Sequence, residues 1–161
     1  MYKIFIDIDE NKQKGVLKEL GLALKTELIK NDNYIVYDNF SQNKLIANEL
    51  EINLFIRLQE IINNQNKLEI IIDENSKVSN GFGKEIYKEL EKIYFKANLG
   101  NGVIYKNNVS NILKEQNTPV VFIGIINYND KAQIEWTNNN MKELAQTINI
   151  GIGNAFGLIP C

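Results

Sequence analysis

Two carboxylates at the ends of predicted strands, Glu10 and Asp73, are the side chains of this sequence best placed to do chemistry. Residues 2–8 alternate apolar side chains before Glu10, and the apolar run 68–73 ends in Asp73. Carboxylate oxygens suit hard cations such as Mg²⁺, Mn²⁺ or Ca²⁺. Two hypotheses stay open for this pair: the residues form a carboxylate metal site, or they are two solvated loop carboxylates.

The absence of histidine removes most other catalytic chemistry from the chain. Without imidazole there is no Ser-His-Asp or Cys-His catalysis, no imidazole base and no zinc site with histidine ligands. The one cysteine, Cys161, is the last residue, so it forms neither an internal disulfide nor a cysteine-rich zinc site. We therefore expect no zinc and no other cofactor. Cys161 is incidental, or it pairs with another molecule.

Length, charge and hydropathy limit the class of protein further. The 161 residues suffice for a single domain, 1–161, with a buried core. The net charge is −2 and the lysines are spread along the chain, which does not support nucleic-acid binding. No window is apolar enough to span a membrane, and the first residues do not resemble a signal peptide. We expect a cytoplasmic location as synthesised, or the cell wall if a leader was trimmed or lysis releases the protein.

Strand and helix patterns alternate along the chain. Apolar runs predict strands, and apolar residues at helical spacing predict helices. We expect strands at 2–8, 34–37, 68–73, 103–105 and 119–126, helices at 16–30, 45–62, 83–97 and 141–155, and one or two helical turns at 109–117. The polar segments 74–82 and 127–140 are expected to be irregular.

This order favours an α/β fold of three layers, with a mostly parallel central sheet and helices on both faces. The strands 2–8, 68–73 and 119–126 are nearly continuously apolar, so we expect them to be mutually parallel and near the centre. Ligands in such sheets bind at the carboxyl ends of the strands. The loops after Ile8, Ile72 and Ile126 are therefore the expected site.

Three segments of the chain resemble motifs of one enzyme family. They are IFID at 4–7 with the turn that follows it, the interval from Arg57 through LEIIIDENS at 68–76, and PVVFIGIIN at 119–127 with the closing LAQTINIGIGNAFG at 144–157. These segments and the order of elements resemble the catalytic domain of zinc-dependent N-acetylmuramoyl-L-alanine amidases. Such cell-wall hydrolases cut the bond between the lactyl group of muramic acid and the first residue of the stem peptide.

The resemblance implies a site whose catalytic groups are replaced. The family's two histidine ligands fall on Glu10 and Asp73, and its catalytic glutamate falls on Gly124. Its remaining zinc ligand, a glutamate, falls near Lys14, and Glu19 lies about a turn deeper. We therefore expect Glu10, Asp73 and Gly124 to be vestigial site positions around one shallow surface, with no catalytic residue and no metal ligands. Gly124 has a second interpretation, as a strand glycine under a closely packed helix.

Four further residues are candidates for supporting roles. The resemblance implies a structural role for Arg57, which otherwise is a solvated helix residue. As the one arginine of a chain rich in Lys, Asn and Ile, Arg57 also indicates an AT-rich genome. Asn75, Ser76 and Trp136 are candidates to line a groove for saccharide or peptide. The alternative for Asn75 and Ser76 is a solvated loop, and the alternative for Trp136 is a core or partly buried position.

Three functions follow from these expectations. The first is a catalytically inactive amidase relative, a pseudoenzyme that binds, regulates or scaffolds in cell-wall or phage-lysis biology. Its partner would be peptidoglycan or a cell-wall protein. The second is an active peptidoglycan hydrolase with a non-zinc metal on Glu10, Asp73 and a third oxygen ligand. The third is an unrelated α/β interaction domain.

Overall fold

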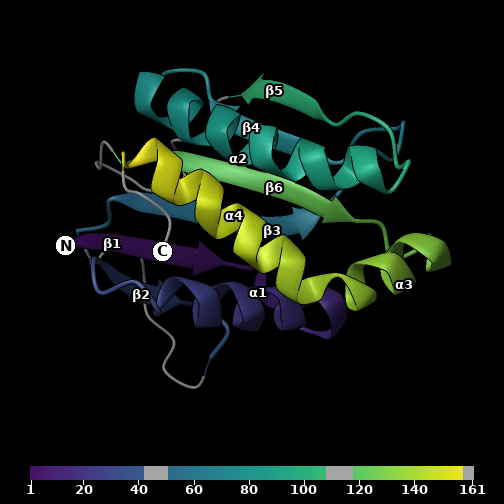
Figure 1. The fold of residues 1–161 in the computed structure, drawn as a ribbon, viewed down its shortest axis with the longest axis horizontal. Helices are drawn as coiled ribbons and strands as arrows, with labels where there is room; N and C mark the ends of the chain where they lie inside the picture. The colour runs from purple at the N-terminus through teal and green to yellow at the C-terminus, as the bar shows by residue number, and fades with distance from the viewer. Residues whose placement is uncertain (42–50, 108–117, 158–161) are drawn as a thin grey trace.

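The computed structural model describes residues 1–41, 51–107 and 118–157. Its elements in chain order are β1 (Tyr2–Asp7), the 3-10 helix η1 (Glu10–Lys12), α1 (Gly15–Leu28), β2 (Tyr34–Asp38), β3 (Leu54–Glu60), β4 (Glu69–Asp73), α2 (Lys77–Lys96), β5 (Val103–Asn107), β6 (Val120–Ile126), α3 (Lys131–Asn139) and α4 (Met141–Ala155). The strands of this described part form one sheet in the order β2-β1-β3-β6-β4-β5 (Figure 1).

The sheet is mostly parallel. Within the described residues four of the five strand pairings are parallel, and β4 against β6 is antiparallel. The expected α/β class is thus confirmed, but the expectation that 68–73 is parallel to 2–8 and 119–126 is wrong. Residues 61–68 join β3 to β4, and this connection is shorter than the roughly dozen residues that a parallel crossover needs. The chain therefore turns back, and β4 runs the other way.

The segment expected as a helix over 45–62 contains strand β3 instead. Residues 45–50 of that segment lie outside the described part. Leu54, Ile56 and Leu58 pack in the core beneath the helices, while Phe55 belongs to the cluster on the other face. A short run that is apolar on both faces cannot be distinguished from a buried helix by spacing alone. Pairing with β1 on one side and β6 on the other makes it a strand.

The remaining elements follow the expected pattern with two exceptions. Helix α2 begins at Lys77 rather than Gly83, because the Ser76 side chain accepts a hydrogen bond from the Ser79 N–H and caps the helix. Helix α3 lies in the segment expected to be irregular, where Asp130 caps it by accepting from the Gln133 N–H. The helical turns expected at 109–117 lie outside the described residues. No helix in the described ranges is long and apolar enough to cross a membrane.

The helices α1, α2 and α4 cover one face of the sheet, and α4 runs across it between the other two (Figure 1). Aliphatic side chains from these helices and the strands form the main core. A smaller cluster lies on the second face; its buried members are Phe5, Ile52, Phe55, Ile71, Val120 and Phe122. The expected layer of helices over this second face stays a prediction.

The contact between α2 and α4 is close because α4 presents a glycine there. A Cβ added at Gly151 would lie 2.6 Å from the Ile86 Cα, closer than atoms pack. Because the obstacle is backbone, it cannot be relieved by a change of rotamer.

We expect Gly151→Ala to lower the free energy of unfolding by about 1–3 kcal/mol, because the methyl group forces α4 away from α2. Urea denaturation measures this. Gly81→Ala is the matched control, since Gly81 is also helical and nothing lies within 4 Å of its added Cβ. The control should be neutral or slightly stabilising because alanine favours helix. Equal stability of the Gly151→Ala variant and the parent would contradict the packing argument.

A buried ion pair holds the carboxyl end of β2. The Asp38 carboxylate accepts from the Lys25 ammonium at 2.6 Å and from the N–H groups of Phe40 and Ser41 at 3.0 and 2.7 Å. Burial alone would raise the pKa of Asp38, but the hydrogen bonds from Lys25 and Ser41 outweigh it, so the pKa of this carboxyl lies below its usual value of 3.8.

We expect Asp38 to contribute stability above pH 3.8, where the carboxyl of the unfolded chain is also ionised. This contribution is lost as the pH falls through the lower pKa of the folded state. Urea denaturation of Asp38→Asn and the parent from pH 7 to 2 should show a gap that narrows on acidification. The exposed Asp32→Asn is the control and should show no gap. A gap independent of pH would contradict the ion-pair argument.

Candidate functional site

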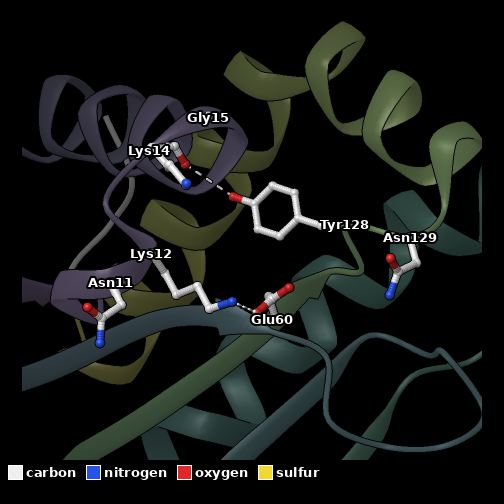
Figure 2. A pocket seen from close by; sticks show the side chains of 7 residues that line it. All are labelled: Asn11, Lys12, Lys14, Gly15, Glu60, Tyr128 and Asn129. Atoms are coloured by element: carbon white, nitrogen blue, oxygen red, sulfur yellow. Dashed lines mark hydrogen bonds and ion pairs between the residues drawn. The ribbon is translucent and has the colours of Figure 1, made fainter.

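The carboxyl ends of β1, β3 and β6 meet at one edge of the sheet, because these adjacent strands are parallel. The segments that follow them surround a pocket of about 610 Å³ (Figure 2). Its lining residues are Asn11, Lys12, Lys14, Gly15, Glu60, Tyr128 and Asn129. Of the three loops expected to form the site, those after Ile8 and Ile126 do so. The third contribution comes from the end of β3 and not from Ile72.

An ion pair crosses the pocket from η1 to β3. The Lys12 ammonium lies 2.9 Å from the Glu60 carboxylate (Figure 2). Asp9 shapes the tight turn that presents Lys12, since its side chain accepts from the Asn11 N–H and its carbonyl from the Lys12 N–H. Glu60 is fixed as the last residue of β3. The hydrogen bond to Glu60, followed by its charge, raises the pKa of Lys12, so this side chain stays a cation in the pocket.

Tyr128 joins the loop after β6 to the start of α1. Its hydroxyl donates to the Lys14 carbonyl at 3.2 Å and accepts from the Leu17 N–H at 3.3 Å. Lys14 is the N-cap of α1 and makes no side-chain capping bond, so the tyrosine hydroxyl meets a helix N–H that a capping side chain would otherwise satisfy. Figure 2 shows the Tyr128 ring between the start of α1 and the Lys12–Glu60 pair.

Arg57 braces the end of β1 on the second face of the sheet. Its Nε donates to the Asp7 carboxylate, and its guanidinium lies over the Phe122 ring, 5.1 Å from the centroid. Asn39 donates to the other Asp7 oxygen at 2.7 Å and pairs with the backbone N–H and C=O of Ile8. These contacts fix the point at which the chain leaves β1 and enters the pocket turn.

Asp73 does not lie with the other two expected vestigial positions. Glu10 opens η1 at the pocket edge, but Asp73 ends β4, whose neighbouring residue Ile72 pairs with Val121 near the start of β6. Because β4 is antiparallel to β6, its carboxyl end lies at the opposite edge of the sheet. The expectation of one surface around Glu10, Asp73 and Gly124 is therefore wrong for Asp73.

The groove candidates also lie elsewhere. Asn75 and Ser76 follow Asp73 at that opposite edge, where Ser76 caps α2. Trp136 is partly buried against Tyr94, with ring centroids 5.0 Å apart, in the helical layer. Glu19 lies on the exposed side of α1 and does not line the pocket.

β3, and not the strand at 69–73, lies between β1 and β6. Its last residue, Glu60, therefore lines the pocket, and Asp73 does not. The helical spacing of apolar residues over 45–62 predicts a helix and hides the strand INLFIRLQE at 52–60. Nothing in the sequence points to Lys12 or Asn129, because they are isolated polar residues without a motif.

Gly124 is confined by a buried carboxylate of the neighbouring strand. In the register of the sheet it lies between Gln59 of β3 and Glu69 of β4. Glu69 is fully buried, and its Oε1 accepts from the N–H groups of Ile62 and Asn63 at 3.1 and 2.9 Å. An added Cβ at Gly124 would lie 2.4 Å from the Glu69 Cγ. Glycine is therefore required here by a side chain, rather than by a helix.

The side chains in the described part of the chain do not form a set of donors that fits a catalytic zinc ion. Within the described ranges no group of three or more His, Cys, Asp or Glu side chains could hold a metal. The pocket edge carries a lysine cation where a metal site needs anionic or neutral donors.

Comparison with known proteins shows the fold. No family model matches the sequence, and no curated protein does either. Solved structures do match. The CwlD amidase from Clostridioides difficile, solved in complex with the GerS lipoprotein, has a TM-score of 0.76 and 14% identity over 98% of this chain and 99% of that one. This chain has the fold of N-acetylmuramoyl-L-alanine amidase catalytic domains.

Two further structures agree. The catalytic domain of CwlV, an amidase from Bacillus (Paenibacillus) polymyxa var. colistinus, has a TM-score of 0.71 and 15% identity over 99% of this chain and all of that one. The catalytic domain of the CD27L endolysin, which targets Clostridia difficile, has a TM-score of 0.69 and 16% identity over 96% and 98% of the two chains. These low identities establish the fold alone.

We expect Gly124→Ala to lower the free energy of unfolding by about 1–3 kcal/mol, because the methyl group collides with Glu69. The double variant Gly124→Ala/Glu69→Ala should lose less than the sum of the two single variants, since removing Glu69 opens the space. Urea denaturation of all four proteins measures this coupling. Additive losses would contradict the direct collision.

Proposed function

We propose that this chain is a catalytically inactive relative of the N-acetylmuramoyl-L-alanine amidases that acts as a binding module in cell-wall or phage-lysis biology. The amidase-domain fold of the whole chain supports the connection to the cell wall. The observation that carries the loss of activity is the Lys12–Glu60 ion pair, which places a protein cation in the pocket at the shared ends of β1, β3 and β6.

Hydrolysis of an amide needs a polarised carbonyl, an activated water and stabilisation of the oxyanion. In the amidase family that this chain resembles, a metal polarises the carbonyl and activates the water, and a glutamate accepts the proton of that water. Here Gly124 offers no side chain, and Glu69 fills the space in which a restored side chain would begin. The geometry therefore favours binding over turnover.

The alternative of an active hydrolase with a non-zinc metal on Glu10 and Asp73 is not favoured by the positions of these two residues. Asp73 lies at the opposite edge of the sheet from η1, so the two carboxylates cannot share one ion. A protein ligand remains a second candidate for the module, favoured by the CwlD structure, which was solved with a lipoprotein bound. The location we propose is the cytoplasm as synthesised, with access to the wall after lysis or through a leader.

We expect the purified full chain to co-sediment with peptidoglycan sacculi and to release no stem peptides from them, with or without added Zn²⁺, Mg²⁺ or Mn²⁺. Binding is measured by the protein left in the supernatant and release by new amino groups. An active amidase of the same fold is the positive control for release. Metal-dependent, saturable release would overturn the proposal, and so would sacculi that leave all of the protein in solution.

A further inference from the structure

The pocket carries more hydrogen-bonding capacity than the protein uses. Lys12, Lys14 and Glu60 line it; Lys12 is paired with Glu60 and also lies in the field of the Asp9 carboxylate, so the unpaired cation of the pocket is Lys14. Among the described residues, no partner engages the Lys14 ammonium or the side-chain amides of Asn11 and Asn129. Lys12 donates one of its three N–H bonds to Glu60 and keeps two. All these free groups are donors, or amides that can act as donors.

The frame that holds these groups is built in advance. The Asp9 turn and the Glu60 carboxylate hold Lys12, and the Tyr128 hydroxyl ties the Lys14 backbone to the loop that carries Asn129 (Figure 2). The three supporting strands are adjacent in one hydrogen-bonded sheet. A ligand therefore meets a backbone frame and a Lys12 side chain that are already held, and binding has to order only the Lys14, Asn11 and Asn129 side chains.

A pocket with an unpaired lysine and free hydrogen-bond donors favours a free carboxylate over an intact amide. An intact amide is neutral and gains only ordinary hydrogen bonds from lysine. A free carboxylate gains charge-assisted bonds, which are shorter and roughly twice as strong. The lysine pair thus favours an acid over the amide from which it is released.

We infer that the pocket between Lys12 and Lys14 binds a free carboxylate of a cell-wall fragment in preference to an uncut amide bond. This inference rests on the proposed function, which supplies the kind of molecule, a cell-wall fragment. The residues of the pocket supply the chemical group, a carboxylate. Two wall carboxylates fit the chemistry. One is the lactyl carboxylate of muramic acid that has lost its stem peptide, and the other is the terminal carboxylate of a stem peptide.

The test is an NMR titration of the full ¹⁵N-labelled chain at pH 7 and low salt. The probes are N-acetylmuramic acid against its lactyl N-methylamide, and acetyl-D-alanyl-D-alanine against its C-terminal amide. We expect one acid to shift the amide signals of Asn11, Lys12 and Asn129 and its neutral partner to bind at least about tenfold more weakly. The acid that binds identifies the source. Equal shifts by both members of each pair, or shifts only outside the pocket, would overturn the inference.

Matched variants distinguish direct binding by the pocket lysines from the effect of the protein's overall charge. Lys14→Gln and Lys12→Gln should each weaken binding of the preferred acid about fivefold or more, because each removes a charge-assisted donor. Lys88→Gln is the control, since Lys88 is exposed on α2 and does not line the pocket. Because Lys12→Gln also breaks the pair with Glu60, Glu60→Gln is a second test and should bind the acid at least as well as the parent. Equal weakening by Lys88→Gln would overturn the inference.

Failure here is distinguishable from failure of the proposed function. Binding to sacculi without preference for either acid refutes the carboxylate pocket and leaves the binding module in place. Binding of an acid at the pocket without binding to sacculi refutes the cell-wall role and supports the anion site. Absence of both refutes both.

Discussion

The pairing of β6 with β3 fixes the strand order and the place of the pocket. β6 follows β3 by a long stretch of chain, yet it lies directly against it and separates β3 from β4. This insertion brings the carboxyl ends of β1, β3 and β6 to one edge and creates the pocket. It also forces β4 to take the free side of β6, where its direction is set by the short connection from β3.

The chemistry at the pocket edge of the sheet follows from two charges, Lys12 on η1 and Glu60 at the end of β3. A metal centre gathers anionic and neutral donors around one cation, and here the cation is Lys12, bound to the chain itself. The protein thereby keeps a positive group in the pocket, and that group is a donor of hydrogen bonds. The proposed recognition of a carboxylate depends on this property.

Gly124 and Glu69 depend on each other in the packing of the sheet. Once Gly124 has no side chain, Glu69 of β4 can cross above it and satisfy the N–H groups of the loop at 62–63. That loop is held further by Asn66, whose side chain donates to Asp130 at the start of α3. A side chain at position 124 would collide with Glu69, which holds this loop.

The α/β class, the strands β1, β2, β4, β5 and β6 and the helices α1 and α4 can be predicted from the amino-acid sequence, because their apolar residues follow the period of one element. The sequence also excluded histidine chemistry by composition. Only the tertiary structure decided that β3 is a strand and that β4 is antiparallel, since both depend on which distant segment becomes the neighbour. The site cannot be predicted for the same reason. In the sequence Asp73 ends a strand as Glu10 does, but β4 is antiparallel to β6, so Asp73 lies at the opposite edge of the sheet. Lys12, Glu60 and Tyr128 have no common motif, because they are brought together by the register of three strands and not by spacing along the chain.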